Sequence, residues 1–186
     1  MRQVLETTRS LPAADLHDDR TVAALQAATE RRPTVAGKPE RPLLDTAMQR
    51  LGAQQPLVVG DRLDTDIAGA CAAGLESLLV LSGVADAAAL LAAEPEQRPV
   101  HVGADIRALQ EPRERTRIQP QPGWRVDVDG DSVLLHSDGT VADPLDALRT
   151  LCAVWWAQRS GPAQVRGADE CAGAALKALG LVADQV

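Results

Sequence analysis

The chain lacks Phe and Tyr altogether, and its only aromatic residues are three Trp. It is nevertheless 45% hydrophobic over 186 residues, which is enough apolar material for a core. That core must be packed from Ala, Leu and Val rather than from rings. The length suits one domain, or one domain with a small appendage.

Basic charge is also scarce. The formal net charge is −7 and the sequence pI about 4.9, and no basic tract is present. These features argue against nucleic-acid binding, because a protein that binds nucleic acid needs a basic surface along the phosphate backbone. The short run RERTR at 113–117 lies near Pro residues and predicts a solvated linker. Only Lys38 and Lys177 are lysines among the 19 Lys and Arg residues, so seventeen are arginines and a retained lysine is worth attention.

Cysteines are few and odd in number, and long apolar runs are missing. Cys71, Cys152 and Cys171 have no ligand-like spacing, which favours buried reduced thiols in a cytosolic protein. No stretch of 18 apolar residues occurs, and the start, MRQVLETTRS, has no apolar signal core. We therefore expect a cytoplasmic location.

Hydrophobic patterning over the first 110 residues predicts strands alternating with helices. Apolar runs without alternation, typical of strands covered on both faces, occur at 56–60, 77–83 and 99–103. Helical spacing connects them, and short connections favour a parallel sheet with helices on its faces. The expected helices span 21–30, 39–52, 66–74, 86–94 and 105–110, and a short apolar step with a turn spans 34–39.

The pattern changes after a Pro-rich stretch at 111–123, which we interpret as a linker. Residues 124–141 alternate and predict two or three antiparallel strands that turn at Asp129-Gly130 and Asp138-Gly139. A helix at 143–159, a strand near Val165 and a helix at 168–180 complete a small α+β unit. The predicted organisation is thus a partial core domain at 1–110, a linker at 111–123 and a C-terminal α+β domain at 124–186.

Three carboxylates follow the first apolar strand in the run VVGDRLDTDIAGA at 58–70. Asp61, Asp64 and Asp66 stand at a carboxyl-terminal strand edge, where open α/β sheets bind ligands. Hard oxygen donors favour Mg²⁺. Asp66 could instead cap the following helix, and Asp64 could simply face water, so the residues alone leave metal binding open.

Lys38 lies in a Gly-Lys-Pro turn just before the helix predicted at 39–52. A helix N-terminus with an adjacent ammonium favours an anion such as phosphate. A solvated turn lysine is the ordinary interpretation of this residue by itself. A lysine some twenty residues before an apolar strand that ends in GDxxxxD is a more specific signal of a phosphate site than the lysine alone.

Residues 36–84, AGKPERPLLDTAMQRLGAQQPLVVGDRLDTDIAGACAAGLESLLVLSGV, resemble the C-terminal part of the core of haloacid dehalogenase (HAD) superfamily phosphatases. The resemblance extends over about residues 20 to 110 and is to the subfamily with a large α/β cap, which includes nitrophenyl-phosphatase-like, phosphoglycolate and glycerol-3-phosphate phosphatases. With the PGW segment and the C-terminal unit, the layout is similar to actinobacterial glycerol-3-phosphate phosphatases. It implies a partial Rossmann-like core, a parallel sheet with flanking helices.

The resemblance also implies roles for single residues. Lys38 takes the place of the lysine that neutralises the transferring phosphoryl group. Asp61 takes the place of the direct Mg²⁺ ligand, and Asp66 that of the acidic residue that supports the metal through water. Arg62 and Asp64 fill variable positions and receive no role.

The nucleophile of the family is expected to be absent from this chain. In the family, an Asp in an N-terminal DxDG-type motif attacks phosphorus and forms an aspartyl-phosphate. Asp127 and Asp129 in VDVDGDS fit that pattern, but the alternating residues around them predict a hairpin. An EF-hand-like Ca²⁺ loop is a poorer match, because no Glu follows at the twelfth position.

These features define three alternatives. In the first, the chain is the C-terminal portion of a Mg²⁺-dependent phosphatase that acts on small phosphorylated metabolites of the glycerol-3-phosphate or phosphoglycolate class. In the second, it is a non-catalytic relative of such an enzyme. In the third, it is one subunit of a split enzyme. His17, His101 and His136 are isolated and carry no predicted chemistry. Of the adjacent Trp155 and Trp156, one should face the core and the other a partner or the other domain. The family's sheet implies an uncovered edge at strand 56–60, and hence self-association, a partner chain or coverage of the edge by the chain's own N-terminal segment.

Overall fold

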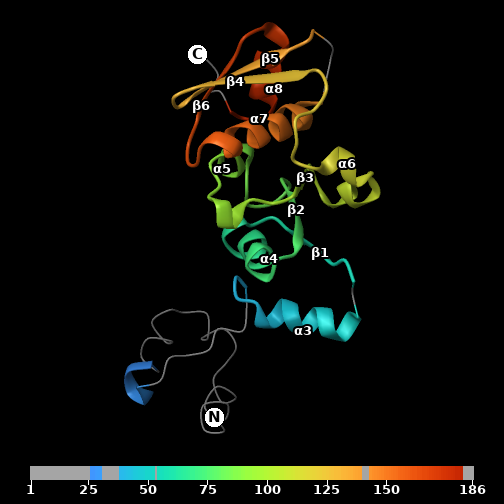
Figure 1. Ribbon diagram of the computed structural model, residues 1–186, viewed down its shortest axis with the longest axis vertical. Helices are drawn as coiled ribbons and strands as arrows, with labels where there is room; N and C mark the ends of the chain where they lie inside the picture. Colours follow the sequence, from blue (N-terminus) through green and yellow to red (C-terminus); the bar gives the residue numbers. More distant parts are fainter. Residues whose placement is uncertain (1–25, 31–37, 53, 140–142, 182–186) are drawn as a thin grey trace. The chain divides into compact units, whose positions relative to one another are not determined.

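A computed structural model describes residues 26–30, 38–52, 54–139 and 143–181 (Figure 1). The chain divides into two units, residues 1–35 and 36–186. In the first unit, the described residues carry a short helix at 26–29, within the helix expected at 21–30. The remainder of that expected helix lies outside the described residues, as does the apolar step expected from residue 34 to 37.

Three parallel strands form the first sheet of this unit, in the order β1-β2-β3. They are β1 (Leu57–Gly60), β2 (Glu76–Val80) and β3 (His101–Gly103). Leu57 lies opposite Glu76, and Leu78 lies opposite His101. The predicted parallel sheet is therefore confirmed, with β1 and β3 inside the apolar runs that predicted them and β2 beginning one residue before its run.

Helices precede, connect and follow these strands within the ranges that the sequence predicted. α3 (Pro42–Leu51) ends at Gly52, and α4 (Ala68–Ala73) ends at Gly74, both glycines having the left-handed backbone of a helix C-terminus. The Asp86 side chain accepts a hydrogen bond from the Ala89 N–H and caps α5 (Ala87–Leu91). Short 3-10 helices follow as η3 (Pro95–Gln97) and η4 (Ile106–Gln110). A π-helix, η2 (Leu63–Ile67), precedes α4, and the periodicity did not predict it.

The stretch predicted as a linker contains structure. A four-residue helix, α6 (Arg113–Thr116), occupies the RERTR run, and the Thr116 side chain in it is buried. Arg113 forms an ion pair with Glu76 of β2, with 3.2 Å between the nitrogen and the oxygen. The run is thus attached to the parallel sheet through Arg113 and Thr116, while its other residues are exposed, and its assignment to a linker stays a prediction.

A second sheet follows, with β4 (Trp124–Asp129), β5 (Ser132–Ser137) and β6 (Gln164–Gly167). β4 and β5 form the predicted antiparallel hairpin, which turns at Gly130 with φ 58°. β6 pairs with β5 in parallel. α7 (Pro144–Gln158) and α8 (Glu170–Ala178) complete the predicted α+β arrangement.

One continuous core joins the two sheets. Its buried side chains come from the parallel-sheet region, such as Leu79 and Val102, and from α7, such as Leu148 and Trp155. Trp156 lies partly buried beside this core, and its indole N–H donates to the Leu91 carbonyl of α5 at 3.0 Å. As expected from the adjacent Trp pair, one ring is in the core and the other contacts the neighbouring sheet region. The proposed division at residues 110 and 124 stays a prediction.

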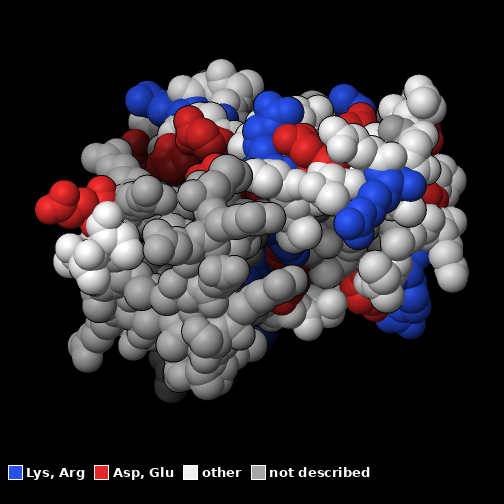
Figure 2. Space-filling view, turned by 90° about the horizontal axis from the view of Figure 1, so that it is seen from below, with Lys and Arg blue, Asp and Glu red and all other residues white. Residues whose placement is uncertain are grey.

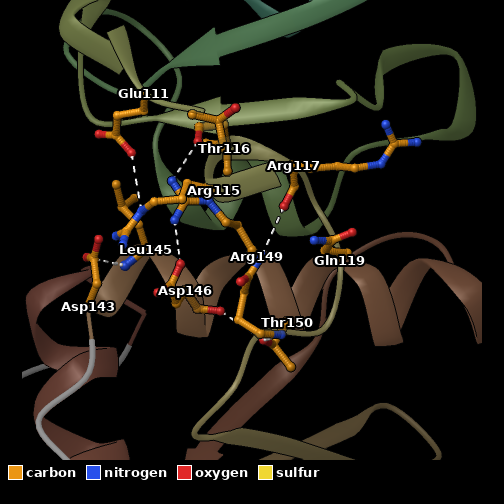
Figure 3. A network of polar contacts seen from close by, with 12 residues as sticks. Glu111, Arg115, Thr116, Arg117, Gln119, Asp143, Leu145, Asp146, Arg149 and Thr150 are labelled. Carbon is orange, nitrogen blue, oxygen red and sulfur yellow. Dashed lines mark hydrogen bonds and ion pairs between the residues drawn. The ribbon is translucent and has the colours of Figure 1, made fainter. Parts of the chain in front are cut away.

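Polar contacts cross the same junction (Figure 3). Arg149 of α7 is 2% exposed, and its guanidinium donates to the Val102 carbonyl of β3 at 2.9 Å. It also contacts Asp146, one turn earlier, at 2.6 Å. In the opposite direction, Arg98 donates to the Trp156 and Arg159 carbonyls at 3.2 and 3.1 Å and lies over the Trp156 ring. A buried arginine was not predicted in α7.

The two faces of the parallel sheet are covered unequally. Leu79 and Val102 on one face belong to the large core. On the other face, Leu78 and Val80 form a small cluster with Ala108, and Leu57 and Val59 of β1 are only partly buried against it. The apolar run at 56–60 predicted a strand covered on both faces, and within the described residues β1 is not.

The cysteines only partly fit their prediction. Cys152 is buried, whereas Cys71 and Cys171 are half-buried, and all three are free thiols. Burial raises the pKa of the Cys152 thiol and that of Cys71. Among the described residues, no helix has the length and apolarity needed to span a bilayer. On the face drawn in Figure 2, Lys and Arg lie interspersed with Asp and Glu rather than forming a continuous basic area.

Candidate phosphate and metal site

The predicted site residues gather where β1 ends. Gly60 is the last residue of β1, Asp61 follows it, and η2 then carries Asp64 and Asp66. This is the carboxyl-terminal edge of the parallel sheet, the usual position of ligand sites in open α/β folds. Ile67, the residue after Asp66, is fully buried in the large core and fixes the end of η2.

Asp66 and Lys38 are brought into direct contact across 28 residues of sequence. Asp66 is only 6% exposed, and its Oδ1 accepts from the Lys38 ammonium. Its Oδ2 accepts from the Arg62 backbone N–H at 3.2 Å. The Lys38 side chain itself is 40% exposed. The lysine is therefore paired at the strand end yet still partly open to solvent.

Gly60 makes this position of Asp66 possible. A Cβ added at residue 60 would lie 2.2 Å from the Asp66 Cβ and 2.4 Å from its Oδ2. These distances are far below van der Waals contact. Any side chain at residue 60 would therefore displace the Asp66 carboxylate.

Asp61 is held by the loop that follows β2. Its Oδ2 accepts from the Val84 backbone N–H at 3.0 Å, and its backbone carbonyl accepts from the Ala85 N–H at 2.9 Å. A Cβ added at Gly83 would lie 2.0 Å from the same Oδ2. Among the described residues, Oδ1 of Asp61 has no hydrogen-bond partner. The loop thus fixes one carboxylate oxygen and leaves the other available.

Gly83 and Val84 contact the predicted site residue Asp61, and sequence reasoning missed them. The signal was present, because a Gly directly after the apolar run at 77–82 marks a close approach of backbone. Nothing in the sequence, however, indicated which carboxylate this backbone approaches. Only the spatial order of β1 and β2 provides that information.

Arg62 and Asp64 form an exposed pair of their own, with Arg62 Nη2 2.7 Å from Asp64 Oδ2. The hydrogen bond from Arg62 lowers the pKa of Asp64. The pKa of Arg62 is raised mainly by Asp64, with smaller contributions from Asp61 and Asp66.

The donor set suits only part of a divalent-cation site. No group of three or more His, Cys, Asp or Glu placed to hold a metal ion occurs among the described residues. Asp61 and Asp66 nevertheless supply hard carboxylate oxygens at one strand end. Such oxygens match Mg²⁺, which keeps several waters and takes few protein ligands. The residues therefore fit a Mg²⁺ ion whose remaining ligands are water or other groups.

The second DxDG-like stretch lies in the hairpin, as predicted. Asp127 and Asp129 belong to β4. The Asp127 carboxylate lies 2.9 Å from Arg125 Nη1, with which it forms an ion pair, and 2.9 Å from His136 Nε2 of the neighbouring strand. These contacts are those of an ordinary cross-strand charge cluster.

Two family models match the chain and correspond to its two sheets. Residues 35–109 match the HAD-hydrolase-like family, and residues 121–181 match the GCN5-related N-acetyltransferase (GNAT) like domain. The resemblance of the first of these ranges to HAD-type phosphatases, indicated by its sequence, is confirmed by the family match and by the relatives that follow. Below, the two matched ranges are called the HAD-like segment and the GNAT-like segment.

Among individual proteins, the chain is similar to D-glycerol 3-phosphate phosphatase of Mycobacterium tuberculosis. The two are 42% identical over 167 residues, which cover 84% of this chain and 47% of that protein. It is also 46% identical over 72 residues to phosphoglycolate phosphatase 2 of Arabidopsis thaliana, covering 38% of this chain and 24% of that protein.

Solved structures give the same result. A glycerol phosphate phosphatase from Mycobacterium tuberculosis in complex with magnesium matches with a TM-score of 0.78 and 43% identity, covering 87% of this chain and 48% of that one. A calcium complex of that enzyme matches with a TM-score of 0.80. The fold prediction is thereby confirmed. The chain spans about half the length of this relative.

Proposed function

We propose that this chain is the lysine- and metal-bearing portion of a Mg²⁺-dependent HAD-type phosphatase for small phosphomonoesters. One observation carries the proposal: Lys38 contacts Asp66 at the strand end where Asp61 stands. A half-exposed ammonium beside two carboxylates is suited to bind a phosphoryl group and a hard cation together.

In this proposal, each residue has a distinct task. Asp61 offers its free carboxylate oxygen to Mg²⁺, and Asp66 orients Lys38 and supports the metal through water. Lys38 neutralises negative charge on the phosphoryl oxygens. The bound ion supplies Lewis-acid stabilisation of that charge. The magnesium complex of the mycobacterial relative supports the choice of metal.

The substrate class is proposed from the relatives. Their names specify D-glycerol 3-phosphate and phosphoglycolate as substrates, and a third relative, from Corynebacterium glutamicum, is a dihydroxyacetone phosphatase. The substrates that these names indicate are all small molecules. The 186 residues hold a DxDG pattern only in the hairpin, so we propose that an Asp beyond these residues serves as nucleophile. In this proposal, groups that also lie outside these 186 residues determine which substrate of the class is used.

A binding experiment tests the half-site without requiring turnover. The chain is titrated with MgCl₂ and, separately, with inorganic phosphate, and backbone amide shifts are followed by NMR. We expect Mg²⁺ to bind with a dissociation constant on the order of 1 mM or weaker, as at an open oxygen site of low charge. Shifts should centre on residues 60–67 and 83–85.

Matched variants decide the assignment. Asp61→Asn should abolish the Mg²⁺-dependent shifts, whereas Asp64→Asn, an exposed neighbour paired with Arg62, should leave them unchanged. Lys38→Ala should remove the phosphate response, and Lys177→Ala should not. Equal loss in Asp61→Asn and Asp64→Asn would mean non-specific binding to acidic surface and would contradict the proposal. Micromolar Mg²⁺ affinity would show that the site is complete and that further ligands were overlooked.

A further inference from the structure

The second sheet has a free edge at β4 within the described part of the chain. The strand order is β4-β5-β6, so β4 pairs with β5 on one side and with no described strand on the other. Asp129 and Ser132 lie opposite each other across a two-residue loop, and residues that flank such a loop exchange both hydrogen bonds. Alternate residues of β4, counted back from Asp129, therefore direct their backbone groups toward β5, and the residues between them direct theirs toward the free edge.

Two hydrogen bonds at the start of β4 agree with this alternation. The Gly123 carbonyl accepts from the Asp138 N–H at 3.0 Å, so the backbone of residue 123 faces β5. The Trp124 N–H donates instead to the Gln121 carbonyl at 3.3 Å, so it faces away from β5. The residues of β4 whose backbone groups lie at the free edge are therefore Trp124, Val126 and Val128.

The apolar face of the second sheet is incompletely covered at this edge. Val126 and Val128 are only partly buried against the large core. Their partners in β5, Leu135 and Val133, are 0% and 1% exposed. A further strand at the free edge, with apolar side chains on the same face, would cover the two valines from the side.

The outward face of β4 carries charges of both signs. The side chains of Arg125 and Asp127 are 64% and 52% exposed, so both are accessible to a neighbouring molecule. Charged residues on an edge strand usually discourage pairing with other chains. A basic and an acidic residue two positions apart are, however, self-complementary when two such strands pair in antiparallel fashion, because each Arg125 can then stand opposite an Asp127.

We propose that the free edge of β4 is the contact between two copies of this chain related by a two-fold axis. Antiparallel pairing centred on Val126 places the two Val126 residues opposite each other and Val128 opposite Trp124 of the partner subunit. The same register places Arg125 opposite the partner's Asp127, and this pairing occurs twice. The two three-stranded sheets then form one continuous sheet. The contact lies in the GNAT-like segment and uses no residue of the proposed phosphate and metal site.

The charges favour this register over its neighbours. The backbone alternation also allows the two-fold axis to pass by Arg125 or by Asp127. An axis at Arg125 would place two guanidinium groups opposite each other, and an axis at Asp127 would do the same with two carboxylates. Like charges directly opposite each other destabilise a strand pair. The other edge of the sheet, β6, carries Arg166 and no acidic residue, so two copies that met there would gain no such pairs.

Sedimentation velocity of the full 186-residue chain over a wide range of concentration tests the contact. A single pair of short strands makes a small interface of the transient class, so we expect a concentration-dependent equilibrium between monomer and dimer. Hydrogen exchange at Val126 and Val128 should slow as the dimer forms. A chain that stays monomeric at the highest concentration would overturn the proposal, as would a dimer protected at residues 57–60 instead.

Charge reversal at the two exposed positions locates the contact. Arg125→Asp and Asp127→Arg each bring like charges together twice and should weaken dimerisation at least tenfold. An equimolar mixture of the two variants restores opposite charges across the edge and should dimerise about as well as the unaltered chain. Both variants lose the ion pair within their own chain, so an effect of that pair alone would persist on mixing and would overturn the proposal.

Two controls complete the design. Asp129→Asn keeps the turn chemistry of the hairpin and alters a residue that lies opposite Gly123 of the partner subunit in this register, so it should dimerise unchanged. A loss equal to that of Arg125→Asp would indicate a shifted register and contradict the proposed one. Asp61→Asn should also dimerise unchanged, so a failed metal site and a failed interface give different results.

Discussion

Arg149→Met is the sharpest test of the continuous core that joins the two segments. The substitution preserves much of the side-chain volume but removes the guanidinium that donates to the Val102 carbonyl and contacts Asp146. A hydrogen bond from a charged donor contributes about 1.5–3 kcal/mol. Breaking a buried ion pair by removing one partner costs about 3–5 kcal/mol.

The ion-pair figure needs reduction, because the Asp146 side chain is 21% exposed and can be rehydrated. Arg149 also has a buried Nε without a partner among the described residues, so its removal relieves one unfavourable group. We therefore expect a net loss of about 2–3 kcal/mol in the free energy of unfolding. The matched control is Arg115→Met, since Arg115 is 59% exposed and its ion pair with Glu111 spans 3.7 Å (Figure 3). That control should change stability by less than about 0.5 kcal/mol.

Urea unfolding with two probes measures the effect. Trp fluorescence reports on the region around α7, and hydrogen exchange at β2 and β3 reports on the parallel sheet. Because the core is continuous, both transitions should move together in Arg149→Met. A loss below 0.5 kcal/mol, or a shift in only one probe, would refute the argument that Arg149 couples the segments.

Three further predictions concern the site and its surroundings. Gly83→Ala should displace the Asp61 carboxylate, weaken Mg²⁺ binding beyond detection and lower the free energy of unfolding by about 1–3 kcal/mol. Its control, Gly173→Ala, has open space around it in α8 and should raise the free energy of unfolding by about 0.5–1 kcal/mol. Mg²⁺ titration and urea midpoints measure the two effects. Burial lowers the pKa of His101 in the folded chain below its ordinary value of 6.5, so between the folded and unfolded pKa values the unfolded chain binds more protons. The free energy of unfolding should therefore fall as the pH drops below about 6.5. His101→Gln should reduce this pH dependence, which is measured by comparing urea midpoints at pH 5 and 7.5. The 186-residue chain alone should hydrolyse p-nitrophenyl phosphate no faster than background with Mg²⁺ present, and activity lost on Asp127→Asn would instead make the hairpin the source of the nucleophile.

Sequence reasoning succeeded where a residue's surroundings are local. The uninterrupted apolar runs located three parallel strands, and Asp129-Gly130 located the hairpin turn, because strand burial and turn geometry depend on neighbouring residues. The motif around Lys38 and Asp66 was recognised from its spacing. The direct contact between the two side chains could be known only from the fold.

Sequence reasoning failed where packing against residues distant in the sequence determines the structure. By residue type Arg149 is expected in solvent. It is nevertheless buried, and its guanidinium donates a hydrogen bond to the Val102 carbonyl of β3. The π-helix over residues 63–67 was missed for a similar reason. Its geometry accompanies the approach of Asp66 to Gly60, and no periodicity encodes that contact.

The same packing explains how the GNAT-like segment bears on a site to which it contributes no ligand. Ile67 follows Asp66, and Ala85 follows the Val84 N–H that holds Asp61, and both apolar residues are buried in the large core. That core is completed from the other side by Leu148 and Trp155 of α7. The backbone segments that carry Asp66 and hold Asp61 are therefore anchored in a core to which α7 also contributes. Since buried side chains fix the backbone that carries them, the GNAT-like segment supports the positions of Asp61 and Asp66 from behind the sheet.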